Sequence, residues 1–274
     1  MEKTLGDRMK RYELEEAGRR MLPRLPILAR LDGRAFHTFT RGLRRPFDED
    51  FCRCMALTTA KLVDKFHASL GYTQSDEITL FWLNNDPQRE MMFDGRYQKW
   101  TSLLAAAATR QFCNAIDIHL SAKSHLDPEF DCRVWQVPDM TEAYHAFLWR
   151  EDDATRNSLQ MASQAIYTRK ELFKKGRAEL HEMLFQKGIN WNDYPPFFKR
   201  GTYVRRMPYE HTLTAAELAR IPAAHRPTEP VVRTAVFPLA APPLFQLKAL
   251  GPLLDGTVPA QQKVFSLYHP EDYR

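Results

Sequence analysis

Apolar residues in the first 140 positions recur at either strand-like or helix-like spacing. The strand-like runs cover 27–31, 68–73, 78–83 and 132–137, and the helix-like segments cover 48–66 and 100–116. The first run follows Pro26 and ends at Asp32-Gly33, as a buried strand that stops at a turn does. The order is therefore strand, helix, strand, strand, helix, strand.

This order is that of the ferredoxin-like βαββαβ motif, an α+β fold. Its first two strands run in the same direction and the third runs back. The end of the first strand and the hairpin between the second and third strands therefore share one edge of the sheet. Asp32 ends the first strand and Asp76 lies in that hairpin. The topology thus predicts that two carboxylates distant in sequence meet at one sheet edge.

The pattern changes after position 138. Capping-box spacing at the start of 139–149 predicts a helix there, and a further helix is predicted over 153–169. The stretch after residue 207 holds ten of the 18 prolines and little periodicity, so it forms either a loosely structured extension or a wrap on the main body. We expect three regions: the ferredoxin-like domain over 1–138, a helical and basic region over 139–206 packed on that domain, and a Pro-rich C-terminal extension over 207–274.

The formal net charge of +5 is unevenly distributed. Between residues 169 and 206 there are ten Lys or Arg and four Asp or Glu, with seven aromatic residues interleaved. Cations neutralise phosphates and aromatic rings stack unpaired bases, so this segment suits contact with RNA. A solvated helix face beside ordinary core aromatics has the same composition, and charge alone leaves both interpretations open.

No apolar run reaches the ~20 residues that a membrane span requires, so we expect no membrane partner. The N-terminal segment lacks the apolar core of a signal peptide. The four cysteines, Cys52, Cys54, Cys113 and Cys132, have no zinc-type spacing. We expect them to be reduced and structural, in keeping with a cytoplasmic protein.

The two carboxylates predict a magnesium site. Mg²⁺ prefers oxygen ligands and usually binds one or two carboxylates together with substrate phosphates. Asp32, Asp76 and the carbonyl of Gly33 are suitable ligands, and the adjacent Glu77 could act in the outer sphere. Asp-Gly and Ser-Asp-Glu are also common turn sequences, and a purely structural role is the alternative.

Several cations could bind a triphosphate close to these carboxylates. Arg34, His37 and Arg45 follow the first one, and Arg96 and Lys99 stand at the start of the second long helix. Positive side chains are electrostatically misplaced at a helix N-terminus, and a bound anion would explain them. Exposed solubilising charge is the alternative for each residue.

Four motifs in order, from about residue 27 to residue 202, resemble the tRNA-His guanylyltransferase superfamily. They are Arg30-Leu-Asp-Gly-Arg-Ala-Phe-His37, Tyr72-Thr-Gln-Ser-Asp-Glu77, Gly95-Arg-x-x-Lys99 and Lys199-Arg-Gly-Thr202. The resemblance implies a polymerase-type palm that adds nucleotides to the 5′ end of tRNA in the 3′-to-5′ direction. It also implies two Mg²⁺ ions, ATP and GTP or other nucleoside triphosphates as substrates, and a homotetramer.

The resemblance also implies roles for particular residues. Asp32, Asp76 and Glu77 would be catalytic, and Asp32, Asp76 and the Gly33 carbonyl would bind the metal ions. The nucleotide would be bound by Asp32, Gly33, Arg34, Ala35, Phe36, His37, Arg45, Ser75, Asp76, Arg96, Lys99 and Asn157. Lys199 and Arg200 would contact RNA.

One departure from the family pattern concerns substrate choice. Members specific for tRNA-His carry His-Ile-Asn-Asn where this chain has Thr155-Arg-Asn-Ser158. The chain is in this respect similar to the bacterial and archaeal guanylyltransferase-like proteins, which implies template-dependent repair of 5′-truncated tRNA. The alternatives are addition of a single G to tRNA-His, a palm-type nucleotide cyclase, and a non-catalytic ferredoxin-like RNA-binding module.

Overall fold

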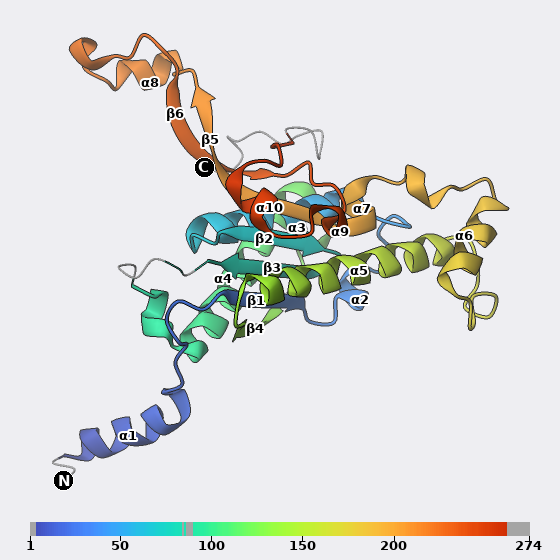
Figure 1. Ribbon diagram of the computed structural model, residues 1–274, viewed down its shortest axis with the longest axis horizontal. Coiled ribbons are helices and arrows are strands. Elements are labelled where there is room, and N and C mark those ends of the chain that lie inside the picture. The colour runs from blue at the N-terminus through green and yellow to red at the C-terminus, as the bar shows by residue number, and fades with distance from the viewer. Residues whose placement is uncertain (1–3, 84, 86–89, 262–274) are drawn as a thin grey trace.

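The computed structural model describes residues 4–83, 85 and 90–261. Its centre is one antiparallel sheet of six strands in the order β4-β1-β3-β2-β5-β6 (Figure 1). The strands are β1 (Ile27–Gly33), β2 (Leu70–Gln74), β3 (Glu77–Trp82), β4 (Phe130–Gln136), β5 (Thr202–His211) and β6 (Val231–Pro238). The first four follow the ferredoxin-like order, so the predicted βαββαβ fold is confirmed.

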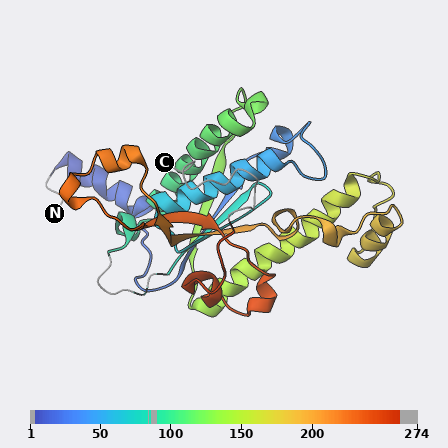
Figure 2. The same cartoon turned by 90° about the horizontal axis from the view of Figure 1, so that it is seen from above.

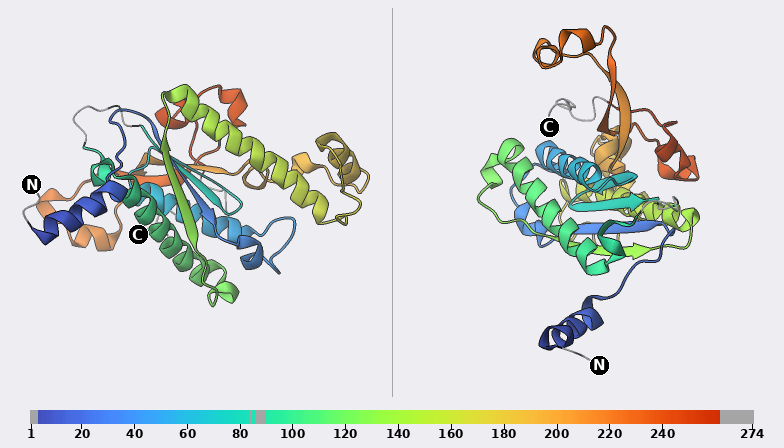
Figure 3. Two further views of the ribbon diagram at one scale, coloured as in Figure 1. Left: turned by 90° about the horizontal axis from the view of Figure 1, so that it is seen from below. Right: turned by 90° about the vertical axis from the view of Figure 1, so that its left-hand side faces the viewer.

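Helices cover both faces of the sheet (Figures 2 and 3). One face bears α3 (Glu49–Lys65) and α4 (Tyr97–His119), and the other bears α5 (Met140–Gln164) with the short α9 (Leu244–Leu247) and α10 (Gly251–Asp255). The remaining helices are α1 (Leu5–Ala17), α2 (Phe36–Phe39), α6 (Arg177–Phe185), α7 (Pro196–Arg200) and α8 (Ala215–Ala219). Short 3₁₀ turns lie at Met92–Gly95, Ser121–Lys123, Trp191–Asp193 and Ala223–His225.

Strand alternation divides the core between the two faces. On β1, Ile27, Ala29 and Leu31 are buried against α3 and α4, whereas Leu28 is buried on the α5 side. Helix α3 begins where predicted because the side chain of Asp48 accepts hydrogen bonds from the N–H groups of Asp50 and Phe51, both at 3.1 Å. All four cysteines are free thiols, and none of the helices in the described ranges is long and apolar enough to span a bilayer.

The two helices expected over 139–149 and 153–169 are a single helix, α5, which ends at Gln164. The break expected between these two helices does not occur. Arg150 and Glu151 are both buried and bind partners distant in sequence, so the helix continues through them. α5 consequently reaches from the sheet to the small helical cluster around α6 (Figure 1).

The C-terminal region contains regular structure that its prolines concealed. β5 pairs with β2 through Gly71↔Val204 and with β6 along its length, so the boundary expected at 206/207 falls within a strand. The tip of this hairpin projects from the body (Figure 1), whereas α9 and α10 pack on the α5 face. The expected wrap therefore occurs over part of the region, and residues 262–274 lie outside the described part.

Candidate active site

Asp32 and Asp76 meet at one edge of the sheet, as the topology predicted. Asp32 ends β1, and Asp76 lies in the two-residue turn between β2 and β3. The N–H of Gly33 donates to the carbonyl of Asp76 at 3.1 Å, which ties the strand end to the turn. The position of both residues thus depends on the order and pairing of the strands, which the sequence pattern predicted.

Three carboxylates form a row across neighbouring strands. Asp32 on β1 pairs with Glu77 on β3 and with Asp131 on β4, and cross-strand pairs point to the same face of a sheet. Glu77 accepts hydrogen bonds from Nε and Nη2 of Arg150, both at 2.7 Å, and Asp131 lies 3.2 Å from Arg133. Among the described residues, no hydrogen bond or ion pair engages the Asp32 carboxylate. Asp32 is therefore available to a ligand.

The electrostatics of Asp76 favour a cation. Burial and then the negative charge of Asp32 raise the pKa of its carboxyl, against the hydrogen bond from Ser75 and the charge of His37. Two carboxylates that repel each other at a partly buried edge fit a divalent ion, which would remove the repulsion. The described ranges contain no cluster of three or more His, Cys, Asp or Glu arranged for a metal, so further ligands would come from the Gly33 carbonyl, water or substrate phosphates.

The loop after Asp32 is held close to the core. A Cβ on Gly33 would lie 2.4 Å from the ring of Phe36, so only glycine fits there. Phe36 is buried against Phe130 and Phe112, with ring centroids at 5.1 and 5.4 Å. Ala35, at φ 55°, has the left-handed conformation that non-glycine residues rarely adopt.

This anchoring leaves the polar residues of the loop at the surface. Arg34 and His37 are exposed, and Arg34 forms a 2.6 Å ion pair with Glu129. An exposed ion pair of this kind contributes little to stability, so a phosphate could replace the carboxylate at low cost. The loop can therefore offer cations and backbone N–H groups beside Asp32.

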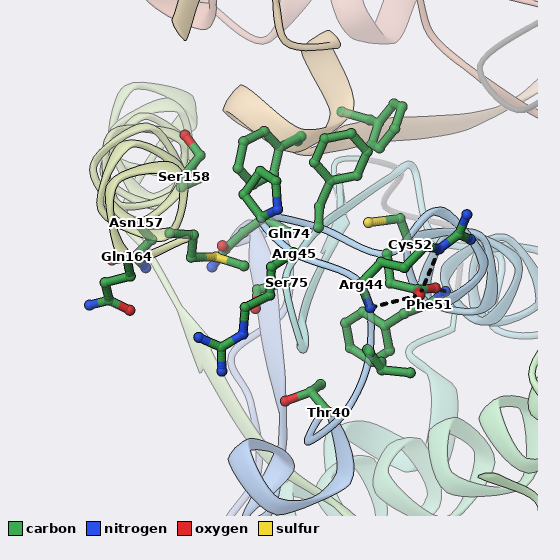
Figure 4. A pocket seen from close by; sticks show the side chains of 18 residues that line it. Thr40, Arg44, Arg45, Phe51, Cys52, Gln74, Ser75, Asn157, Ser158 and Gln164 are labelled. Carbon is green, nitrogen blue, oxygen red and sulfur yellow. Dashed lines mark hydrogen bonds and ion pairs between the residues drawn. The ribbon is translucent and has the colours of Figure 1, made fainter. Parts of the chain in front are cut away.

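Figure 4 shows a cavity of about 230 Å³. It adjoins the acidic edge, the end of the sheet that carries Asp32 and Asp76, because Ser75 lines it. Phe47 and Phe198 stack at 4.7 Å in its apolar wall. Three predicted nucleotide-binding residues line it: Arg45, Ser75 and Asn157. Asn157 and Gln164 from α5 lie opposite Phe51 of α3 and Arg44, which precedes that helix (Figure 4). An apolar interior with polar groups at its margin is typical of a site for a small ligand such as a nucleoside.

A chain of contacts joins this cavity to the acidic edge. The Asn157 amide donates to Asp153 at 3.2 Å, Asp153 accepts from Arg150 at 2.9 Å, and Arg150 holds Glu77. Sequence reasoning did not identify Arg150 or Asp153. Their i, i+3, i+7 spacing with Asn157 places all three on one face of a helix, and this signal was hidden by the break assumed at 150–153.

Burial and pairing act in opposite directions on the buried ion pair. Burial raises the pKa of the Glu77 carboxyl, and the hydrogen bonds and charge of Arg150 oppose that rise. The same pairing raises the pKa of Arg150. Both oxygens of Glu77 are engaged, so this residue fixes the hairpin beside Asp76 and is less accessible to a metal than Asp32.

Arg96 and Lys99 do not join the carboxylates within one chain, contrary to the expected proximity. β3 runs from Glu77 at the acidic edge to Trp82 at the opposite edge, and Trp100 of α4 packs on Trp82 at 4.7 Å between ring centroids. The helix after β3 must begin where β3 ends. Arg96 and Lys99 therefore lie at the far edge of the sheet.

Lys199 also differs from its expected role in contacting RNA. It is buried, its ammonium donates to the Asn192 carbonyl, and it lies 5.4 Å from the centroid of the Trp191 ring. Burial and then the charge of Arg200 lower the pKa of Lys199. Its ammonium is thus used within the protein, whereas Arg200 is partly exposed.

This chain is similar to several known proteins. The family model for tRNAHis guanylyltransferase matches residues 6–138. The tRNA(His) guanylyltransferase of Schizosaccharomyces pombe is 29% identical over 77% of this chain and 83% of that protein. An uncharacterised protein of Acanthamoeba polyphaga mimivirus is 26% identical over 74% of this chain and 77% of that protein.

Two solved structures of bacterial tRNA(His) guanylyltransferase-like proteins are also similar. One, in complex with ATP, is 34% identical over 74% of this chain and 87% of that chain, with a TM-score of 0.70. The other, in complex with GTP, is 28% identical over 89% of this chain and 95% of that chain, with a TM-score of 0.72. This chain belongs to the tRNA(His) guanylyltransferase family, and it is a nucleotidyltransferase.

Proposed function

We propose that this enzyme adds nucleotides to the 5′ end of tRNA in the 3′-to-5′ direction and repairs truncated tRNAs by copying the opposite strand. One observation carries the proposal: Asp32, whose carboxylate has no hydrogen bond or ion pair within the described ranges, lies beside Asp76, next to a cavity lined by Arg45, Ser75 and Asn157. The similar bacterial proteins that bind ATP and GTP support the assignment of this cavity to a nucleoside triphosphate.

The donor set fits magnesium. Asp32, Asp76 and the Gly33 carbonyl would hold the ions, which would neutralise phosphate charge and lower the pKa of the attacking hydroxyl. The residues of the chain would bind and orient. Arg34, His37 and Ser75 would contact phosphate oxygens, and the Arg150–Glu77 pair would keep the hairpin in position.

The reaction needs no protein nucleophile. A 5′-monophosphate end first attacks the α-phosphate of ATP, which forms a 5′-adenylylated end and releases pyrophosphate. The 3′-hydroxyl of the incoming nucleotide then attacks that 5′ phosphate and releases AMP. A 5′-triphosphate end skips the first step and releases pyrophosphate in the second. Catalysis would then rest on positioning and charge stabilisation.

Template dependence follows from the segment that replaces His-Ile-Asn-Asn. Thr155 stands in the place of the family's His, and its hydroxyl donates to the Glu151 carbonyl of its own helix at 2.9 Å. Arg156 pairs with Asp153. Both side chains thus have partners within their own helix, and neither supplies an imidazole. The incoming base would then be selected by Watson–Crick pairing with the opposite strand. A homotetramer and a cytoplasmic location stay predictions from the family resemblance.

The proposal is tested by incubating the protein and Mg²⁺ with tRNAs that lack their first nucleotide, supplying each nucleoside triphosphate separately and sequencing the products. We expect the nucleotide that pairs opposite the gap to be restored in each case. Efficient addition of one unpaired G to intact tRNA-His, with poor repair of truncated tRNAs, would favour the single-G activity. Absence of any incorporation would reject polymerisation at the 5′ end of tRNA.

A further inference from the structure

Part of the sheet face that bears α5 is open above β1 and β4. Behind the row of carboxylates, Arg30 on β1 pairs with Arg133 on β4, and both side chains belong to this face. Half of each side chain of the Arg133–Asp131 pair is exposed. The open surface therefore carries the Arg133 guanidinium behind the acidic edge, whereas the Arg30 side chain is 18% exposed and its Nε lies 3.9 Å from Glu77.

Trp149 of α5 lies over this surface. It is 56% exposed, whereas Trp82, Trp100 and Trp191 are at most 9% exposed. Its ring lies 4.3 Å from the Arg150 guanidinium and 5.6 Å from that of Arg30. The core therefore does not require this indole, yet two arginines hold it in place.

Both arginines connect Trp149 to the acidic edge. Arg150 forms the bidentate pair with Glu77, which lies opposite Asp32. Arg30 precedes Asp32 by two residues on the same strand face, a distance of roughly 7 Å. The indole thus contacts two arginines that adjoin the acidic edge, Arg150 through Glu77 and Arg30 through its place on β1.

We propose that Trp149 is the platform on which the terminal base at the 5′ end of the RNA stacks, so that the 5′ phosphate reaches Asp32 and Asp76. This inference rests on the proposed function. A tryptophan face stacks any base, which suits an enzyme that must accept every 5′-terminal nucleotide.

RNA is favoured over a second nucleoside triphosphate for two reasons. The cavity that suits a nucleotide is lined by Asn157, eight residues or about 12 Å further along α5, on the other side of Arg150. The Trp149 surface is open rather than enclosed, and it can accommodate the flat end of a base-paired stem. Arg133, half of whose side chain is exposed, supplies positive charge for an adjoining phosphate.

The test uses a truncated tRNA that carries 2-aminopurine at its 5′ end, because the fluorescence of this base falls when it stacks. We expect the full-length protein to quench it. Trp149→Ala should abolish the quenching and weaken RNA binding roughly five- to a hundredfold, with ATP affinity within about twofold. Trp149→Phe should retain most of both signals, and Tyr12→Ala, which removes a 61% exposed aromatic on α1, should retain both fully.

Each other outcome overturns the inference. Unchanged quenching in a folded Trp149→Ala protein excludes stacking on this ring, and a loss of ATP affinity assigns the ring to the nucleotide instead. Equal losses for Trp149→Ala and Tyr12→Ala make the effect non-specific. The assay reads binding without turnover, so failure of the wild-type protein to extend tRNA rejects the proposed function separately.

Discussion

The acidic edge and the opposite edge of the sheet both carry charged clusters that the sequence suggested for one triphosphate. The first joins Asp32 and Asp76 through strand pairing. The second, with Arg96 and Lys99 at the start of α4, lies where β3 ends. Position within a motif does not establish proximity, because the direction of each strand decides where the next element begins.

The two edges also differ in their electrostatics. At the acidic edge, like charges lie together and the pKa of Asp76 is raised. At the opposite edge the cations have local partners or solvent: Arg20 pairs with Asp94, and Arg19 lies 4.7 Å from the Tyr97 ring centroid. Only the first arrangement needs a ligand to remove an internal repulsion, which is the stronger indication of a site.

The largest expected effect is loss of activity at the acidic edge. Asp32→Ala and Asp76→Ala should each lower the rate of nucleotide addition by at least ~10²–10³-fold, because each removes a group that stabilises charge in the reaction. Circular dichroism should show an intact fold, since neither side chain contributes to the core.

Asp131→Ala is the matched control, because Asp131 lies in the same row but pairs with Arg133 at an exposed position. It should retain the rate within about threefold. Near-normal nucleotide addition by Asp32→Ala or Asp76→Ala in Mg²⁺ would refute the metal assignment. Equal losses of rate in all three variants would show a general effect of negative charge and no specific metal site.

The next effect concerns the ion pair that fixes the hairpin. Arg150→Ala leaves Glu77 buried without its bidentate partner, which typically costs about 3–5 kcal/mol of unfolding free energy. Urea unfolding measures this loss. Glu77→Gln combined with Arg150→Met should recover part of the stability without restoring the rate. If Arg150→Ala is as stable as wild type, the pair does not hold the acidic edge.

Much of the fold was predictable because the spacing of apolar residues within a short segment distinguishes a strand from a helix. The four ferredoxin-like strands and α3 and α4 begin and end within a few residues of their predicted bounds. The continuity of α5 was missed because Arg150 and Glu151 are charged. Their burial depends on Glu77, on the Tyr203 hydroxyl at 3.0 Å and on the Leu244 N–H at 2.7 Å, all remote in sequence.

The candidate site likewise contains residues whose positions the sequence predicted and residues whose contacts it did not. Asp32 and Asp76 were predicted to meet because strand order alone brings them together. The inward direction of the Lys199 ammonium follows from its contacts with Asn192 and Trp191, which a basic sequence run does not reveal. Position along a strand is thus predictable from periodicity, whereas the partner of a single charge requires the tertiary structure.

A smaller effect is expected on stability. Asp76→Asn should raise the unfolding free energy near neutral pH by about 0.5–2 kcal/mol, since it removes the repulsion with Asp32. A raised folded-state pKa means that the ionised carboxyl destabilises the fold above that pKa. The gain should therefore disappear as the pH falls through the raised pKa towards the ordinary value.

Magnesium should reverse the difference in stability between the wild-type protein and Asp76→Asn. It should stabilise the wild-type protein and leave Asp76→Asn almost unchanged, as thermal unfolding with and without Mg²⁺ would measure. A wild-type melting temperature that is insensitive to Mg²⁺, or a variant that is less stable at neutral pH, would contradict the account of Asp76 as a metal ligand.

The smallest expected effect is at the opposite edge. Lys99→Ala should leave the ATP affinity of a single chain within about twofold. Thr109 of α4 marks the level of the acidic edge, because its hydroxyl accepts a hydrogen bond from the N–H of Phe130, which pairs with Gly33. Lys99 lies roughly 15 Å from Thr109 along the helix. A charge-assisted phosphate contact would instead cost about 1.5–3 kcal/mol, or ten- to a hundredfold. Titration calorimetry at concentrations where sedimentation shows monomers separates the two values. The positive control is Arg45→Ala, which removes a cation from the cavity wall and should lose ATP affinity in the same assay. A tenfold loss of affinity in Lys99→Ala would mean that the triphosphate extends to the far edge.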